Sequence, residues 1–265
     1  MGQFPKLAHT VLTISDAIDR FERPIVTPWG FSLAGHKAMA KGAFEPEETN
    51  MMRNLTHEID IFINVGANVG YYCCHALSLG KPVIAIEPNV RNLWYLMKNM
   101  KNNEWAQKVE IFPLAVGEGP DILEIYGWET GASLIKGWQK MPESFASLTP
   151  TLSLDRILSK ELEGKRSLIM VDIEGAEFMM LKGASETLSN HPPPIWMIEI
   201  HLVEHQPRGV KTNPHFRETF EIFFQHGYKC TTIEKKPMEI TPLVISSIEQ
   251  GKLKLNTHNF LFKKD

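Results

Sequence analysis

Short apolar runs alternate with longer amphipathic segments through most of the chain after Asp60. The apolar runs predict buried strands at residues 61–64, 82–88, 109–116, 167–171 and 194–200. The amphipathic segments, in which apolar residues recur at helical spacing, predict helices from residue 69 and at 89–102, 153–158 and 216–226. Strands that alternate with helices are typical of a mostly parallel sheet covered by helices on both faces. We therefore predict an α/β fold of the Rossmann-like kind.

Both ends of the chain depart from this alternation. Residues 1–40 predict an irregular cap over the core, with a helix near 11–18 and a short hairpin at the turn T-P-W-G-F. A helix at 45–55, with Pro46 in its first turn, opens a single domain that covers 41–265. Late strands at 228–233 and 259–262 are expected to finish the sheet, with a polar loop at 235–251 between them.

A second departure lies in the middle of the domain. Residues 122–126 and 133–135 flank the turn-rich G-W-E-T-G-A, which predicts an inserted hairpin followed by a loop at 139–150. Insertions on a wound sheet commonly carry specificity. Trp128 and Trp138 of this insertion are expected either to stack on a sugar or to cover the hairpin.

The segment I-N-V-G-A-N-V-G-Y-Y predicts a strand, a glycine turn and a helix, which is the geometry of a nucleotide-cofactor loop. Gly66 and Gly70 tolerate backbone angles closed to other residues, and the helix start presents unpaired N–H groups. A dinucleotide site requires a glycine where this chain has Asn68, because a side chain there obstructs the pyrophosphate. Asparagine can instead hydrogen-bond the zwitterionic methionine end of S-adenosylmethionine. We therefore predict that this loop binds S-adenosylmethionine rather than NAD.

The next two strand ends complete the predicted cofactor site. Glu87 ends the second strand, where a carboxylate can accept hydrogen bonds from both hydroxyls of an adenosine ribose. Ala115 and Val116 end the third strand, where small side chains leave room for the adenine and backbone N–H groups lie beside it. Each feature alone is more often a turn or a solvated strand end, so the prediction depends on their joint spacing.

The fourth and fifth strands end in ionisable residues. Asp172 and Glu174 follow the fourth strand, and Glu199 and His201 lie at the end of the fifth, on one face of it. Ligands of open α/β sheets bind outside the carboxyl ends of the strands, so these groups are expected to converge with Gly66 and Glu87. We predict Asp172, Glu174, Glu199 and His201 as catalytic residues, with Asp172 also contacting the cofactor.

Composition and charge narrow the classes of partner. With 265 residues and 43% hydrophobic residues, the chain can bury one large core. The net charge of −3, with both signs well mixed, argues against a nucleic-acid or anionic-membrane partner and favours a small-molecule or glycan acceptor. Neither a signal sequence nor a membrane span is recognisable, so a cytoplasmic protein is expected. The cysteines Cys73, Cys74 and Cys230 lack metal-ligand spacing and are predicted to be reduced core residues.

Several of these segments together resemble the FkbM family of S-adenosylmethionine-dependent methyltransferases, over roughly residues 40–235. The resemblance is carried by N-V-G-A-N-V-G-Y-Y, A-I-E-P-N, P-L-A-V-G, L-I-M-V-D-I-E-G-A-E-F-M-M-L-K-G-A and I-W-M-I-E-I-H, of which D-I-E-G-A-E is the most specific. It implies a class I methyltransferase fold with an antiparallel C-terminal strand pair, and O-methylation of a hydroxyl on a sugar, glycan or natural product.

Two positions qualify the resemblance. The family usually has aspartate where this chain has Asn64, so we expect Asn64 to contact the cofactor without the negative charge. The resemblance also suggests that the segment around Phe44 and Glu45 touches the cofactor, although an ordinary helix start explains these residues equally well.

The base that deprotonates the acceptor hydroxyl has two candidate assignments. In the first, His201 is the base, Glu199 orients it, and Asp172 holds the methionine ammonium or the substrate. In the second, Asp172, Glu199 and His201 bind a divalent ion such as Mg²⁺ that lowers the pKa of the hydroxyl. The metal-free assignment is preferred, because the sequence fixes no coordination shell. The alternative function is a non-catalytic S-adenosylmethionine-binding partner or sensor protein, which the Asn64 substitution keeps open.

Overall fold

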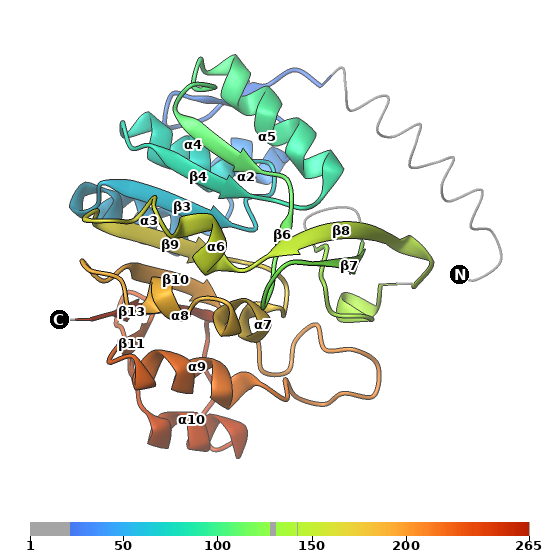
Figure 1. Ribbon diagram of the computed structural model, residues 1–265, viewed down its shortest axis with the longest axis vertical. Coiled ribbons are helices and arrows are strands. Elements are labelled where there is room, and N and C mark those ends of the chain that lie inside the picture. The colour runs from blue at the N-terminus through green and yellow to red at the C-terminus, as the bar shows by residue number, and fades with distance from the viewer. Residues whose placement is uncertain (1–21, 128–130, 142, 265) are drawn as a thin grey trace.

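The fold is centred on an eight-stranded sheet in the order β12-β11-β13-β10-β9-β3-β4-β5 (Figure 1). The structure is a computed structural model that describes residues 22–127, 131–141 and 143–264. The five strands β5, β4, β3, β9 and β10 run parallel, and β13 and β11 close the sheet as antiparallel neighbours. The bounds are β3 Ile61–Val65, β4 Val83–Ile86, β5 Val109–Phe112, β9 Ser167–Val171, β10 Ile195–Glu199, β11 Lys229–Thr232, β12 Glu239–Ile240 and β13 Asn259–Lys263.

Helices cover both faces of this sheet, as its all-buried central strands require. Alternate residues of β3 belong to different cores, because successive side chains of a strand point to opposite faces. Ile61, Ile63 and Val65 pack in one hydrophobic core, while Phe62 packs in the other. The first core is closed by α6 Leu154–Leu158, α7 Glu177–Lys182, α8 Ser185–Leu188, α9 Phe216–Gln225 and α10 Pro242–Glu249. The second is closed by α2 Lys37–Ala40, α3 Pro46–Leu55, α4 Tyr71–Ser78 and α5 Val90–Asn102.

A small three-stranded sheet, in the order β6-β8-β7, projects beside the main sheet (Figure 1). Its strands are β6 Ala115–Val116, β7 Asp121–Tyr126 and β8 Ala146–Leu152. The predicted single strand at 109–116 is therefore wrong: β5 ends at Phe112, and β6 joins the small sheet instead. Pro113 stands between them and has no N–H to continue the ladder of β5.

The inserted hairpin is confirmed, but its second strand lies elsewhere than expected. β7 pairs antiparallel with β8, from Asp121 opposite Thr151 to Tyr126 opposite Ala146. Only Ser133 of the predicted partner 133–135 forms a bridge, to Tyr126. The loop prediction for 139–150 fails at β8, because that strand is mostly exposed and carries no apolar run that would reveal it. Within the described ranges, the short 3-10 helices are η1 Thr56–Glu58, η2 Trp138–Lys140 and η3 Glu143–Phe145.

The N-terminal hairpin is confirmed as β1 Ile25–Val26 and β2 Ser32–Leu33, paired antiparallel across the predicted turn. The helix expected at 11–18 lies outside the described residues. The buried side chain of Asn99 on α5 holds the segment after the hairpin: it accepts from the Ala34 N–H at 2.8 Å and donates to the carbonyls of Ala34 at 3.0 Å and Val69 at 2.8 Å. The hairpin region is thereby fixed against the glycine loop.

The late strand pair is confirmed, with β11 and β13 antiparallel from Lys229 opposite Lys263 onward. The loop predicted at 235–251 is wrong, because it contains β12 and α10. Thr241 caps α10 by accepting the N–H of Val244, Pro242 stands in its first turn, and Ile245 and Ile248 bury one helical face. No helix in the described part of the chain is both long and apolar enough to cross a membrane.

Candidate active site

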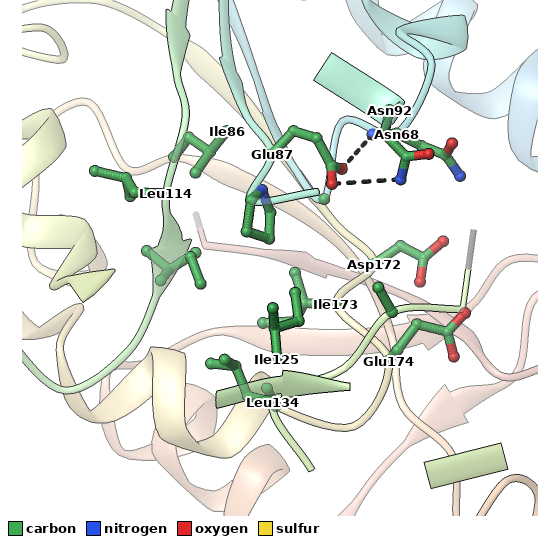
Figure 2. A pocket seen from close by; sticks show the side chains of 16 residues that line it. Asn68, Ile86, Glu87, Asn92, Leu114, Ile125, Leu134, Asp172, Ile173 and Glu174 are labelled. Carbon is green, nitrogen blue, oxygen red and sulfur yellow. Dashed lines mark hydrogen bonds between the residues drawn. The ribbon is translucent and has the colours of Figure 1, made fainter. Parts of the chain in front are cut away.

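A pocket of about 550 Å³, counting the part open to solvent, lies at the carboxyl ends of β3, β4 and β9 (Figure 2). Its wall on one side is apolar and includes Ile86, Leu114, Ile125, Leu134 and Ile173. The opposite side carries the carboxyl groups of Asp172 and Glu174, whose side chains point away from the apolar wall in Figure 2. The small sheet contributes to the pocket through Ala115, Val116 and Ile125.

Gly66 occupies the point where two strand ends meet. Its φ is +83°, and a Cβ placed there would lie 1.8 Å from the carbonyl oxygen of Asp172. The Gly66 N–H donates to the carbonyl of Ile86 at 2.9 Å, and the Asp172 N–H donates to the carbonyl of Val65 at 3.0 Å. Only glycine fits between these backbones, because any side chain would force β3 and β9 apart.

Glu87 lies at the floor of the pocket, almost fully buried, at the end of β4. Three donors hold its carboxylate: the N–H groups of Asn68 at 2.7 Å and Asn89 at 2.8 Å, and the side-chain amide of Asn92 at 3.3 Å. Burial raises the pKa of Glu87 to about 7, and these hydrogen bonds oppose the rise. Asn89 and Asn92 donate to Oε1, whereas the described residues give Oε2 one donor, Asn68, so Oε2 keeps acceptor capacity for a ribose hydroxyl.

Asn68 lines the pocket as predicted, in a left-handed conformation with φ of 53°. Its side-chain oxygen accepts the N–H of Val69 at 2.8 Å and so stabilises the start of the loop before α4. Its backbone N–H is the donor to Glu87 described above. Asn68 therefore joins the ends of β3 and β4, a structural task that the sequence interpretation did not assign to it.

Asn64 and Gly70 stand apart from the pocket lining. Asn64 is buried in β3 on the face of α4, where its side-chain oxygen accepts from the Cys73 thiol at 3.5 Å. A Cβ at Gly70 would meet the Leu96 side chain at 2.5 Å, so this glycine lets α4 and α5 approach each other. The two residues support the loop from behind. Their direct contact with a cofactor stays a prediction, without support from the pocket lining.

Asp172 and Glu199 form a pair of half-buried carboxyl groups at the ends of β9 and β10. Burial, and then repulsion from Glu199 and Glu174, raises the pKa of Asp172 well above its ordinary value. Burial likewise raises the pKa of Glu199 to about 8, although its hydrogen bond with Asp172 opposes the rise. The Oδ1 atom of Asp172 is buried and has no hydrogen-bond partner among the residues that the structure describes. A hydrogen bond between two carboxyl groups requires a proton on one of them, so the raised pKa values and this contact agree that the pair is not fully ionised.

Glu174 is held at the pocket by the insertion that precedes β8. Its Oε2 atom accepts from the Trp138 indole N–H at 2.7 Å and from the Gln139 side-chain amide at 3.0 Å, and its carbonyl accepts from the Ser133 hydroxyl at 2.6 Å. Glu174 has a φ of 55°, and a Cβ at the next residue, Gly175, would lie 2.5 Å from the Trp138 ring. Trp138 thus covers the turn after β9, and its burial to 2% exposure leaves no face of it for a sugar. Trp128 lies outside the described residues.

Glu45, the N-cap residue of α3, lies close enough to these carboxyl groups for its charge to affect them. It has a φ of 40°, and its Oε2 atom accepts from the Tyr72 hydroxyl at 2.6 Å. Burial raises its pKa, and repulsion from Glu45 contributes to the raised pKa values of both Asp172 and Glu199. The family resemblance pointed to this residue, whereas the amphipathic pattern of α3 alone gave no sign that it approaches Asp172.

His201 contacts the carboxyl pair from the far side. Its Nε2 atom lies 2.9 Å from Oε1 of Glu199, and its side chain is 8% exposed. Glu199 and His201 are not among the residues that line the pocket, so they reach it through Asp172. We call Gly66, Asn68 and Glu87 the cofactor side of the site, and Glu45, Asp172, Glu174 and Glu199 the acceptor side.

Residues 64–230 match the family described as Methyltransferase FkbM domain, which is more than half of the chain. The chain belongs to the FkbM methyltransferase family. Its sheet, with β13 inserted antiparallel between β10 and β11, is that of a class I methyltransferase. No curated protein sequence matches the chain.

Solved structures similar to this FkbM methyltransferase are distant relatives. One is a methyltransferase FkbM from Methylobacillus flagellatus KT, which is 16% identical with a TM-score of 0.45. The match covers 86% of this chain and 55% of that one, so this chain spans about half the length of that protein. An O-methyltransferase from Bacillus cereus in complex with SAH is 11% identical with a TM-score of 0.46, over 96% and 88% of the two chains. A precorrin-6y C5,15-methyltransferase from Geobacter metallireducens GS-15 is 12% identical with a TM-score of 0.45, over 88% and 94%.

The cofactor of this methyltransferase is S-adenosylmethionine, and the residues of the pocket fit it. An apolar wall beside Ala115 and Val116 suits an adenine, and the unused acceptor site on Glu87 suits a ribose hydroxyl. The acceptor side gathers carboxyl groups that repel one another, which a sulfonium and an ammonium would relieve.

Proposed function

We propose that this FkbM methyltransferase methylates a hydroxyl group on a sugar, glycan or other natural product. The proposal depends on one observation about the acceptor side. Asp172 and Glu174 line the pocket there, and the charges that raise the pKa of Asp172 all belong to neighbouring carboxyl groups. Carboxylates accept hydrogen bonds and do not donate them, so they select an acceptor that presents donors, as a polyol does. When bound, S-adenosylmethionine supplies an electrophilic methyl group on a positively charged sulfur.

Asp172 is the proposed base, and the positive charge of bound S-adenosylmethionine would lower its raised pKa and so favour the ionised form that can take a proton. It lines the pocket, and its buried Oδ1 atom has no hydrogen-bond partner in the described part of the chain, so a hydroxyl group placed there would supply a donor. The hydroxyl oxygen forms the new bond to the methyl carbon, the carbon–sulfur bond breaks with its electron pair remaining on sulfur, and the hydroxyl proton passes to Asp172. Glu199 holds Asp172 in place through their hydrogen bond.

Glu174 and Glu45 position the reactants around this centre. Glu174 is fixed by Trp138 and Gln139, and Glu45 by Tyr72, so both carboxyl groups keep their places without a ligand. Holding an acceptor oxygen in line with a methyl carbon supplies roughly 7 kcal/mol or more of the barrier in favourable cases. Preorganised carboxyl groups therefore suit a reaction whose main requirement is alignment.

The test is to incubate the protein with isotope-labelled S-adenosylmethionine and a panel of sugars, glycans and hydroxylated natural products, and to weigh the products. The expected result is a mass increase of one methyl group at a hydroxyl, which treatment with Asp172→Asn protein does not produce. Methylation of amines or carbons alone would contradict the hydroxyl proposal. Tight cofactor binding with no product from any acceptor would favour the non-catalytic binding protein instead, a function that loses its original support because Asn64 lies outside the pocket lining.

A further inference from the structure

Three potential metal ligands converge next to the acceptor side: His201, Glu204 and His258. One ligand atom from each lies within 4.8 Å of the others. The sheet explains why they meet, although the two histidines are 57 positions apart in the sequence. β10 and β13 pair antiparallel with Glu199 opposite Asn259, and the Ile200 N–H donates to the carbonyl of His258 at 2.8 Å. The end of one strand and the start of the other therefore bring the two imidazole rings to a centroid distance of 4.5 Å.

The two nitrogen atoms of His201 have different surroundings. Nε2 lies 2.9 Å from Oε1 of Glu199, whereas Nδ1 is buried and has no hydrogen-bond partner among the described residues. A buried polar atom without a partner is costly, by about 1–3 kcal/mol. If Nε2 carries the ring proton and donates it to Glu199, Nδ1 keeps a free lone pair. A histidine that binds a metal through one nitrogen usually donates the other N–H to a carboxylate in this way.

We propose that His201, through Nδ1, together with Glu204 and His258, binds a divalent cation of the zinc class, and that Glu199 orients the His201 ring. Two imidazoles and one carboxylate form a ligand set that Zn²⁺ uses, with a fourth position open to water or another ligand. Mg²⁺ prefers oxygen ligands and is a poor match. This set shares only His201 with the Asp172, Glu199 and His201 set considered from the sequence.

The geometry requires a modest closure around the ion. Ligand atoms bound to Zn²⁺ at about 2.0–2.2 Å lie roughly 3.4 Å apart in a tetrahedral site. The side chains of His258 and Glu204 are 37% and 39% exposed, so they can rotate inward, while the buried His201 stays fixed. The side chains of His258 and Glu204 would therefore move to complete the coordination, while His201 keeps its position.

A second cavity gives access to this cluster. Glu204 and His258 line a space of about 720 Å³, counting the part open to solvent, whose other walls include Leu202, Phe216 and Phe260. An ion held by these two residues and His201 can therefore exchange with solvent without passing through the cofactor pocket. Through His201, Glu199 and Asp172 the cluster is also connected to the acceptor side, although the metal proposal does not depend on the methyl acceptor.

Metal binding is measured on the untagged full-length protein, without cofactor or acceptor, after removal of metal with a chelator and dialysis. Calorimetry with Zn²⁺ and visible absorption with Co²⁺ are expected to show one saturable site. Millimolar Mg²⁺ should not displace either ion. The absorption should lack a cobalt–thiolate band, because Cys73, Cys74 and Cys230 are all buried.

Variants assign the site to these residues. Glu204→Gln and His258→Ala should each weaken Zn²⁺ binding by about tenfold or more, and Glu199→Gln by about 10–100-fold, as expected when the orienting carboxylate is lost. His57→Ala, at an exposed histidine in η1, is the matched control and should bind like the wild type. Circular dichroism checks that each variant folds; if His258→Ala does not, Glu204→Gln at a partly exposed side chain carries the test.

Three results would overturn the proposal: no saturable binding of Zn²⁺ or Co²⁺, unchanged affinity in folded Glu204→Gln protein, or displacement by Mg²⁺. None of them bears on methyl transfer, which is measured separately with labelled cofactor. Loss of the metal site and loss of the proposed O-methylation are therefore distinguishable.

Discussion

The cofactor side and the acceptor side of the site both contain carboxyl groups, but the groups that surround these carboxyls differ in kind. Glu87 on the cofactor side is surrounded by three N–H donors, from Asn68 in the glycine loop, from Asn89 and from Asn92 in the first turn of α5. Asp172 on the acceptor side faces Glu199, Glu174 and Glu45, which repel it. The carboxyl group of the cofactor side is thus held in place by donors before a ligand arrives, although burial still raises its pKa. The acceptor side holds unfavourable charge that binding of a cation or a proton donor would relieve.

The largest expected effect comes from removing the proposed base on the acceptor side. Asp172→Asn keeps the shape of the side chain but cannot take a proton, so the rate of methyl transfer at saturating cofactor should fall by about 10²–10⁴-fold. Cofactor affinity, measured by calorimetry, should change far less. Wild-type rates in a folded variant would show that the acceptor side positions the substrate without acting as a base.

The next prediction concerns the contact between Gly66 on the cofactor side and Asp172 on the acceptor side. Gly66→Ala should lower the free energy of unfolding by ~3 kcal/mol or more, because the new Cβ would overlap the carbonyl oxygen of Asp172. Gly80→Ala is the matched control: Gly80 also has a positive φ, but a Cβ added there would meet no atom within 4 Å, so only ~1 kcal/mol is expected. Both are measured by urea unfolding. Equal losses in the two variants would mean that backbone conformation, and not contact with β9, explains Gly66.

A third prediction concerns the cofactor side alone. Glu87→Ala should weaken cofactor binding by ~2–4 kcal/mol in calorimetry, since hydrogen bonds to a charged group are worth ~1.5–3 kcal/mol each and are not additive. Glu110→Ala, at an exposed position of β5, should leave the affinity unchanged. If Glu87→Ala binds the cofactor normally, the ribose lies elsewhere, and Glu87 is not the cofactor-binding carboxyl group of the site.

The smallest effect is a pH dependence that originates near the acceptor side. Burial raises the pKa of Glu177 to about 8, so the folded protein keeps a proton that the unfolded chain releases above its ordinary value of 4.5. Stability is therefore lost as pH rises between these values, by ~1 kcal/mol per pH unit. Glu177→Gln should reduce that slope.

The useful window for this measurement is pH 6.5–8. Below it, His75 contributes with the opposite sign, because burial lowers its pKa to about 3 and the unfolded chain takes up a proton that the folded protein does not. Glu186→Gln, at an exposed position of α8, is the control and should keep the wild-type slope. An unchanged slope in Glu177→Gln would show that Glu177 is ionised in the folded protein.

The predictable part of the fold is the part with strong local patterns. The sequence predicts the central strands β3, β4, β9 and β10 close to their observed bounds, because each is an apolar run buried on both faces. The failures have two different causes. β8 is largely exposed and has no apolar run that would reveal it. α10 has a capping Thr241, Pro242 in its first turn and an apolar segment, P-L-V-I-S-S-I-E, so the loop prediction for 235–251 overlooked a local helix signal.

By itself, the sequence determined the wound α/β fold, the glycine turn at Gly66 and the place of Glu87, because strand period, glycine and strand ends are local properties of the chain. Only the tertiary structure decided that Asn64 turns toward Cys73, that Trp138 holds Glu174, and that Glu45 approaches Asp172. It also decided that His201 and His258 become neighbours. These contacts join distant segments through the order and register of the strands and the path of the insertion, which no local pattern encodes.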